Sequence, residues 1–181
     1  MQATELLREQ LKMVHKNVEA IMVDVTPEQA HWHPPGTLVN SLAGNYAHIL
    51  VVEDLVINAL LIGGTPLFAS SWAGKTGMSP LPPLPTPQTP GLPTWQDWST
   101  QVHIDLNALR SYAQAVSTAS EQYLASLSDE QLGLTFDLAV LGLGTQTVHW
   151  IVSNVVVAHA HAHRGEIACL KGLQGMRGYL R

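Results

Sequence analysis

Two histidines one helical turn apart are the residues of this sequence best suited to chemistry. His159 and His163 lie four residues apart in the segment Ala-His-Ala-His-Ala-His-Arg-Gly-Glu. Because an α-helix turns about 100° per residue, side chains at this spacing share one face. Helical metal sites present two imidazoles to one ion in this way. His161, two residues from each, is expected to point to the opposite side, toward solvent or a subunit contact.

The face that carries the histidine pair is also the apolar face of its predicted helix. Its other members are Val152, Val155, Val156 and Ile167. We therefore expect both imidazoles to point inward. Buried imidazoles need a hydrogen-bond partner or a cation. The pattern predicts a metal site, and it also allows a hydrogen-bonded histidine pair or a histidine-rich surface patch.

A third nitrogen ligand is available from another predicted helix. His48 has small and apolar neighbours one turn away, including Gly44 and Val52. A lone histidine in such a place is commonly a satisfied core residue, and it becomes a candidate ligand here because His159 and His163 supply two more. Three neutral imidazoles leave a divalent ion with open coordination positions, as in catalytic sites. A bound water or thiol would then be a nucleophile near pH 7.

Glu166 is the candidate catalytic carboxylate. It follows His163 by three residues and His159 by seven, so it lies near the same helical face. From there it can orient a ligand or move a proton. The alternative is a carboxylate near the helix end that pairs with Arg164 or Lys171. His15, which is isolated on its own predicted helix, is not expected to join the site.

Four predicted helices position these residues. They cover Thr4–Val25, the segment from a cap at Asn40 or Ser41 to Ile62, Thr94–Ser126 and Thr145–Leu173. The first shows one apolar stripe at three- and four-residue steps, formed by Leu7, Leu11, Val14, Val18, Ile21 and Val25. Thr4 is expected to cap it and Pro27 to end it. The chain is predicted to be an all-α four-helix bundle, one domain over residues 1–181.

The connection over Gly63–Pro93 predicts the topology. Seven of the eleven prolines fall between Pro80 and Pro93, which favours polyproline-II geometry. Roughly 14 such residues at about 3.1 Å each can span a helix about 30 Å long. A long Pro-rich crossover between helices two and three therefore predicts an up-down-down-up bundle. The second long connection, Leu127–Gly144, is expected to hold a short strand near 134–138.

Composition excludes several classes of partner. The net charge is −5 and Lys and Arg form no run, which argues against nucleic acid and against an anionic membrane surface. No apolar run reaches the roughly 18 residues of a spanning helix. Cys169 is the only cysteine, so an intramolecular disulfide is excluded and a reducing, cytoplasmic location is expected. With 46% hydrophobic and 13% charged residues, the chain has enough apolar material for a core.

Three segments resemble the DinB/YfiT-like family of metal-dependent enzymes. Residues 32–36, Trp-His-Pro-Pro-Gly, are similar to the segment that precedes the family's second helix. Residues 40–48 resemble that helix up to its ligand histidine. Residues 159–166 are similar to the family's signature on the last helix, a His-x-x-x-His followed by Arg-Gly and Gln or Glu. The Pro-rich crossover departs from the family, whose connections here are shorter.

The resemblance implies an up-down-down-up bundle, a site of His48, His159 and His163 for one zinc or nickel ion, and a homodimer. Relatives of known activity are thiol-dependent transferases and isomerases that use bacillithiol, mycothiol or glutathione, and many others have no established reaction. We therefore expect a metal-dependent transferase or hydrolase that activates a low-molecular-weight thiol or water toward a small-molecule substrate.

Two further interpretations stay open from the sequence. In the first, the ion only staples two helices of a non-catalytic dimer that acts as a binding protein. In the second, the bundle holds no metal.

Overall fold

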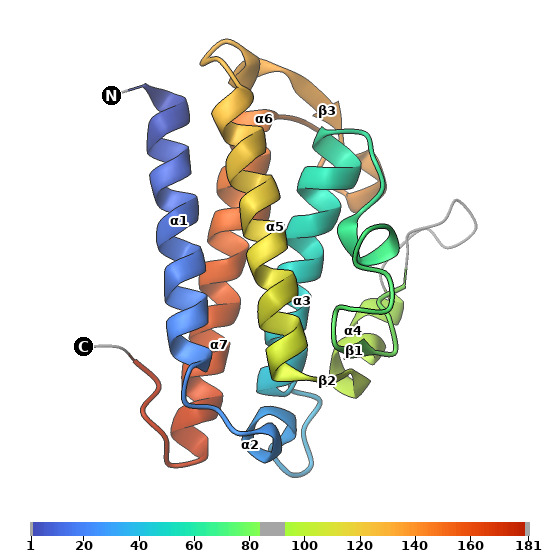
Figure 1. Cartoon of the computed structure of the whole chain (residues 1–181), viewed down its shortest axis with the longest axis vertical. Helices are drawn as coiled ribbons and strands as arrows, with labels where there is room; N and C mark the ends of the chain where they lie inside the picture. The colour runs from blue at the N-terminus through green and yellow to red at the C-terminus, as the bar shows by residue number, and fades with distance from the viewer. Residues whose placement is uncertain (1, 84–92, 180–181) are drawn as a thin grey trace.

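Four long helical rods build the protein (Figure 1). The computed structural model describes residues 2–83 and 93–179. The rods are α1 (Ala3–Met22), α3 (Leu42–Asp54) continued by the π-helix η1 (Leu55–Leu61), α5 (Leu106–Ser126), and the run of α6 (Val148–Ile151), η5 (Val152–Ala158) and α7 (His159–Leu173). The structure is mostly helical, which confirms the predicted all-α class.

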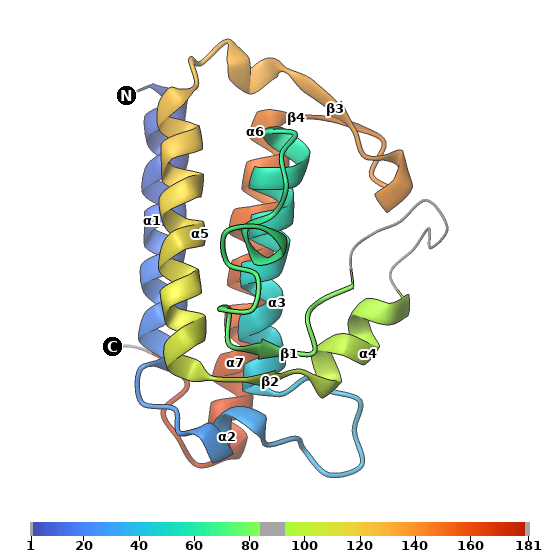
Figure 2. The same cartoon turned by 45° about the vertical axis from the view of Figure 1, so that its right-hand side comes forward.

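The rods pack side by side around one core. α1 contacts α5 and α7, and α3 contacts the same two helices. The colour gradient of Figure 1 shows that α1 and α7 run in one direction and that α3 and α5 run in the other. Figure 2 shows the shorter elements α4 (Pro93–Gln101), β1 (Met78–Ser79) and β2 (His103–Ile104) near one end of α3. The core face of α1 consists of the residues that its periodicity predicts, Leu7, Leu11, Val14, Val18 and Ile21.

The caps of the first helix differ from the prediction. Thr4 is not the cap, because the helix already begins at Ala3. The backbone N–H groups of Ala3 and Thr4 donate instead to the carboxylate of Asp129, at 3.1 and 3.0 Å. Pro27 does not end α1, which stops at Met22, but begins the short helix α2 (Pro27–His31). Proline is favoured at the first position of a helix because its missing N–H would have no partner there.

The predicted helix over Thr94–Ser126 is interrupted. It is divided into α4 and α5, because β2 between them pairs antiparallel with β1. Asp105 then caps α5 by accepting hydrogen bonds from the backbone N–H groups of Asn107 and Ala108, at 2.8 and 3.0 Å. A strand pairing and a strong N-cap together override the helical pattern of the sequence.

The two long connections contain short elements. The first holds the 3-10 helix η2 (Leu67–Ala69) and β1, while the proline-rich part at 84–92 lies outside the described residues. The second confirms the predicted short strand as β3 (Thr135–Asp137), and the 3-10 helices η3 (Gln131–Gly133) and η4 (Ala139–Leu141) flank it. The last helix, expected to start near Thr145, starts at Val148, because Thr145–Thr147 is strand β4, paired with β3. Over 2–83 and 93–179, no helix is both long enough and apolar enough to cross a membrane.

Gly44 allows α3 and α4 to approach closely. A Cβ atom at Gly44 would lie 2.0 Å from the backbone carbonyl oxygen of Ser99. We therefore expect Gly44→Ala to lower the free energy of unfolding by about 1–3 kcal/mol, as measured by urea denaturation. Gly172→Ala on α7 is the control, because a Cβ there meets nothing within 4 Å and should stabilise the helix by up to about 1 kcal/mol. Equal effects of the two substitutions would contradict the proposed clash.

Candidate metal centre

Three histidines converge in the seam between α3 and α7. His48 comes from α3, and His159 and His163 come from the first turns of α7. The Nε2 atom of His159 lies 3.0 Å from that of His48 and 3.1 Å from that of His163. One nitrogen of each ring lies within 4.8 Å of the others. The structure thus brings together the three residues that the sequence nominates.

The helix is locally irregular where it presents the pair. The π-helix η5 ends at Ala158, and the backbone N–H of His159 bonds to the carbonyl of Asn154, five residues back. Such π-turns occur frequently at functional sites, and they rotate the residues that follow relative to an uninterrupted α-helix. Ala160 and Ile167 are buried, whereas His159 and His163 are only half-buried. The imidazoles therefore meet in a partly buried seam between α3 and α7.

The imidazoles of His48 and His159 are held in the neutral form. Burial, together with repulsion from a charge on His163, lowers the pKa of His48 to about 4. Burial and the two neighbouring histidines lower the pKa of His159 to about 3. Neutral imidazole keeps one nitrogen lone pair, which is the form that binds a metal.

The converging Nε2 atoms of the cluster share few protons. The Nδ1 atom of His163 lies 2.7 Å from Oε2 of Glu166, and because a carboxylate only accepts, this nitrogen carries the proton. When the His163 imidazole is neutral, its Nε2 atom has a lone pair directed at His159. A proton on Nε2 of His159 can be donated to His163 or to His48, but not to both. A divalent cation would accept all three lone pairs, so the donor set fits zinc or nickel.

Glu166 contacts a candidate ligand rather than a cation of its own helix. Its carboxylate receives the Nδ1–H of His163. Lys171, one of its expected partners, is buried and donates instead to Asp24 and, at 2.7 Å, to the carbonyl of Ile21. Carboxylates placed like Glu166 fix the tautomer and ring orientation of a metal-binding histidine. His161 is exposed on the other side of the helix, as its spacing predicts.

Removal of the Glu166 carboxylate should weaken metal binding. We expect Glu166→Ala to lower the affinity for zinc about 10- to 100-fold, because the His163 ring loses the partner that orients it. Competition with a chromogenic chelator measures this change. Glu9→Ala, which removes an exposed carboxylate on α1, is the control and should leave the affinity unchanged. Equal affinities of the two variants would show that Glu166 has no role in positioning His163.

The sequence analysis did not predict the contacts of His15. His15 is not isolated, because it contacts Glu53 of α3 and Ser117 of α5. These partners are 38 and 102 residues away along the chain. Spacing within one helix carries no signal of such a contact.

Comparison with known proteins identifies the family of this chain. The family model of the DinB superfamily matches residues 10–167. A similar fold occurs in the crystal structure of a conserved protein from Enterococcus faecalis, with a TM-score of 0.75 at 23% sequence identity, over 96% of this chain and 97% of that one. Among curated proteins, none matches this chain. Since the family match extends from α1 into α7 and includes all three histidines, the chain belongs to the DinB superfamily.

Proposed function

We propose that this protein is a metal-dependent enzyme in which His48, His159 and His163 bind one zinc or nickel ion. The observation that carries the proposal is the convergence of three imidazole nitrogens in a partly buried seam, where the pKa values of His48 and His159 are lowered. Membership of a metal-associated superfamily supports it. The proposed activity is transfer of a low-molecular-weight thiol, or hydrolysis, on a small-molecule substrate.

The residues of the seam have separate roles in this proposal. The bound ion would supply a thiolate or hydroxide nucleophile near neutral pH. His48 and His159 hold the site between two helices, and Glu166 fixes the ring of His163. The Glu166 side chain is 51% exposed, so it can also accept a proton from an entering thiol or water.

We also propose the finer architecture that the resemblance implies. The chain would be a single domain over residues 1–181 with up-down-down-up four-helix topology, and the helix directions seen in Figure 1 support this. A cytoplasmic homodimer without nucleic-acid or membrane partners completes the proposal. Size-exclusion chromatography with light scattering tests the dimer.

A non-catalytic role for the same site is the second candidate. His48 and the His159–His163 pair come from different helices, so a shared ion would staple α3 to α7. A closed coordination shell without bound water would favour this function.

Assays of metal-loaded protein test the proposed enzyme. Protein reconstituted with zinc or nickel would be combined with bacillithiol, mycothiol or glutathione and a panel of electrophiles, and separately with hydrolase substrates. We expect turnover that disappears on chelation and returns when metal is restored. Tight metal binding without turnover in any assay would favour the non-catalytic role, in which the ion only links α3 to α7.

A further inference from the structure

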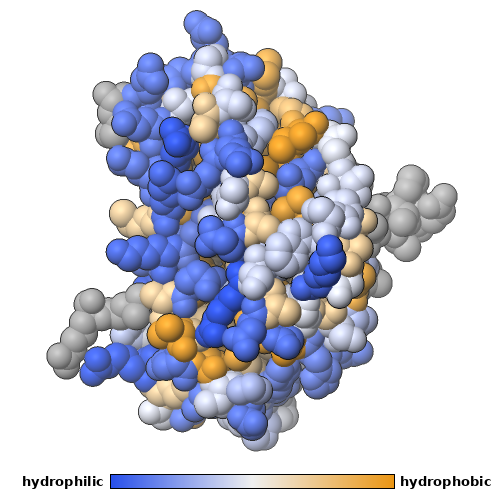
Figure 3. All heavy atoms as spheres, in the orientation of Figure 1, coloured by the Kyte–Doolittle hydropathy of each residue, from blue (hydrophilic) through white to orange (hydrophobic). Residues whose placement is uncertain are grey.

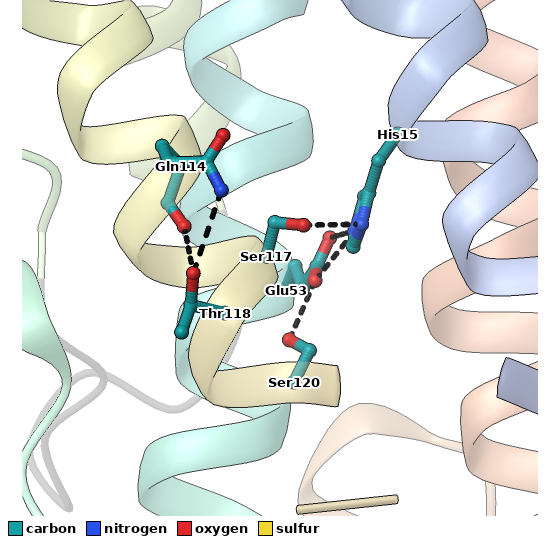
Figure 4. Close-up of polar contacts among 6 residues, drawn as sticks. All are labelled: His15, Glu53, Gln114, Ser117, Thr118 and Ser120. Atoms are coloured by element: carbon teal, nitrogen blue, oxygen red, sulfur yellow. Dashed lines mark hydrogen bonds and ion pairs between the residues drawn. The ribbon is translucent and has the colours of Figure 1, made fainter. Parts of the chain in front are cut away.

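A second cluster of reactive side chains joins α1, α3 and α5 (Figure 4). The hydroxyl oxygen of Ser117 on α5 lies 2.8 Å from Nδ1 of His15 on α1. The Nε2 atom of the same imidazole lies 2.8 and 2.9 Å from the two carboxylate oxygens of Glu53 on α3. Serine, histidine and glutamate therefore form one continuous hydrogen-bonded chain.

The proton positions in this chain follow from the chemistry of its members. The Glu53 carboxylate only accepts, so Nε2 of His15 carries a proton. In the neutral imidazole, Nδ1 then has the lone pair, and the Ser117 hydroxyl donates to it. Ser120 donates to Glu53 at 2.6 Å and fixes the carboxylate, which is only 2% exposed. The nitrogen that faces Ser117 thus has the lone pair that a general base needs, with the two ring nitrogens exchanged relative to the Ser-His-Asp triad.

The chain of hydrogen bonds ends at a cavity. A cavity of about 360 Å³ lies between α1 and α5 above α3, and both His15 and Ser117 line it. Its apolar wall includes Ile49, Leu50 and Ala113. Its polar wall includes Lys16, Arg110 and Gln114. Figure 3 shows that hydrophilic residues gather on this face over α1. The three metal-site histidines are not among the residues that line the cavity, although their chain neighbours Ile49 and Ala160 are.

We propose that Ser117 is a nucleophile activated by His15, and that this cavity is an acyl-transfer site for small carboxylic esters. Glu53 is the positioning residue that holds the tautomer and orientation of His15. The apolar wall suits a short acyl chain. Arg110, two turns before Ser117 on the same helix, donates one N–H to the carbonyl of Met22 at 2.7 Å and has further N–H groups for a carbonyl oxygen that becomes an oxyanion. The Gln114 amide is instead directed at Thr118 (Figure 4).

The reaction uses only the ester and water. Ser117 Oγ forms a bond to the carbonyl carbon while its proton moves to Nδ1 of His15. The carbon–oxygen bond to the leaving group breaks, and the alkoxide takes that proton and departs as an alcohol. Water then attacks the acyl-serine with the same base, which releases the carboxylic acid and restores the Ser117 hydroxyl.

Labelling with an alkyl fluorophosphonate tests the nucleophile. This probe replaces its fluoride with the oxygen of an activated serine, and peptide mass spectrometry locates the adduct. We expect the folded wild-type protein to be labelled at Ser117, with no label in Ser117→Ala. His15→Asn should be labelled at least about 100-fold more slowly, because the general base is lost. Ser126→Ala, which removes an exposed serine of the same helix, should leave the rate unchanged.

Two further measurements separate this site from alternatives. Labelling should persist after chelation of metals and in His159→Ala, because the metal centre takes no part.

The charged groups around His15 are Glu19 on α1, Glu53 on α3 and Glu121 on α5, together with the cations of the cavity wall. Burial lowers the pKa of His15, but the charge and hydrogen bond of Glu53 raise it above its ordinary value.

The role of Glu53 is read from the pH profile of labelling. Glu53→Gln should move the midpoint of the labelling rate to lower pH, because the imidazole loses the carboxylate that favours its charged form.

An unlabelled Ser117 in folded wild-type protein would overturn the proposal. The cluster would then be a hydrogen-bond network that only holds three helices together. Equal labelling rates in wild type and His15→Asn would also overturn it.

Discussion

His159→Ala is expected to abolish stoichiometric metal binding. His159 is the central member of the cluster, with its Nε2 atom near the Nε2 atoms of both His48 and His163. Removing a residue that only hydrogen-bonds to a metal ligand already lowers metal affinity about 10- to 100-fold. Removing a ligand itself should therefore lower the metal affinity by more than about 100-fold. Elemental analysis of protein purified without an affinity tag, followed by chelator competition, measures the change.

The neighbouring histidine provides the control for that experiment. His161 is exposed on the same helix, two residues from His159, so His161→Ala should keep the metal content of the wild type. His48→Ala should behave like His159→Ala, because both remove a nitrogen from the same seam. A wild-type protein that binds no metal after reconstitution would leave the cluster as a core hydrogen-bond network. It would also refute the proposed enzyme, while the fluorophosphonate experiment would be unaffected.

Asp54→Ala is expected to destabilise the fold by about 3–5 kcal/mol, because several buried donors lose their acceptor at once and each costs about 1–3 kcal/mol. Asp54 is completely buried on α3. Its carboxylate accepts hydrogen bonds from the backbone N–H groups of Leu67 and Phe68, at 2.8 and 3.0 Å, and from the Tyr112 hydroxyl at 2.6 Å. Alanine would leave these donors buried without an acceptor.

Urea denaturation followed by circular dichroism measures this loss. Asp137→Ala is the control, because Asp137 is exposed and accepts one backbone hydrogen bond, from Ala139. Its removal should cost about 1 kcal/mol or less. An Asp54→Ala protein as stable as the control would mean that water takes the place of the carboxylate. The connection after η1 would then be held by other contacts.

Local periodicity explains what the sequence predicted correctly. The apolar stripe of α1 and the shared face of His159 and His163 depend only on the 100° turn of an α-helix. Ser41 caps α3 as expected, since its hydroxyl accepts from the N–H of Gly44 three residues later. Gly63, with a φ of 74°, follows Ile62, the residue at which the second helix was predicted to end. Each of these features is encoded within one or two turns.

Contacts between distant segments explain where the prediction failed. The cap of α1 comes from Asp129, 125 residues or more along the chain. The break before α5 requires β1 and β2 to meet across more than twenty intervening residues. Helical propensity and the spacing of apolar residues depend only on nearby residues, so they contain no information about a strand partner that far away. For that reason the segment Thr94–Ser126 was predicted as one continuous helix.

The sequence by itself determined the helical class of this protein and the residues able to bind a metal. Composition, apolar periodicity and the four-residue spacing of His159 and His163 suffice for that, because each is a property of a short stretch of chain. Only the tertiary structure decided that His48 meets this pair, that the site is half-exposed, and that His15 lies between Glu53 and Ser117. These are distances between separate helices, which depend on how the helices pack rather than on the pattern within any one of them.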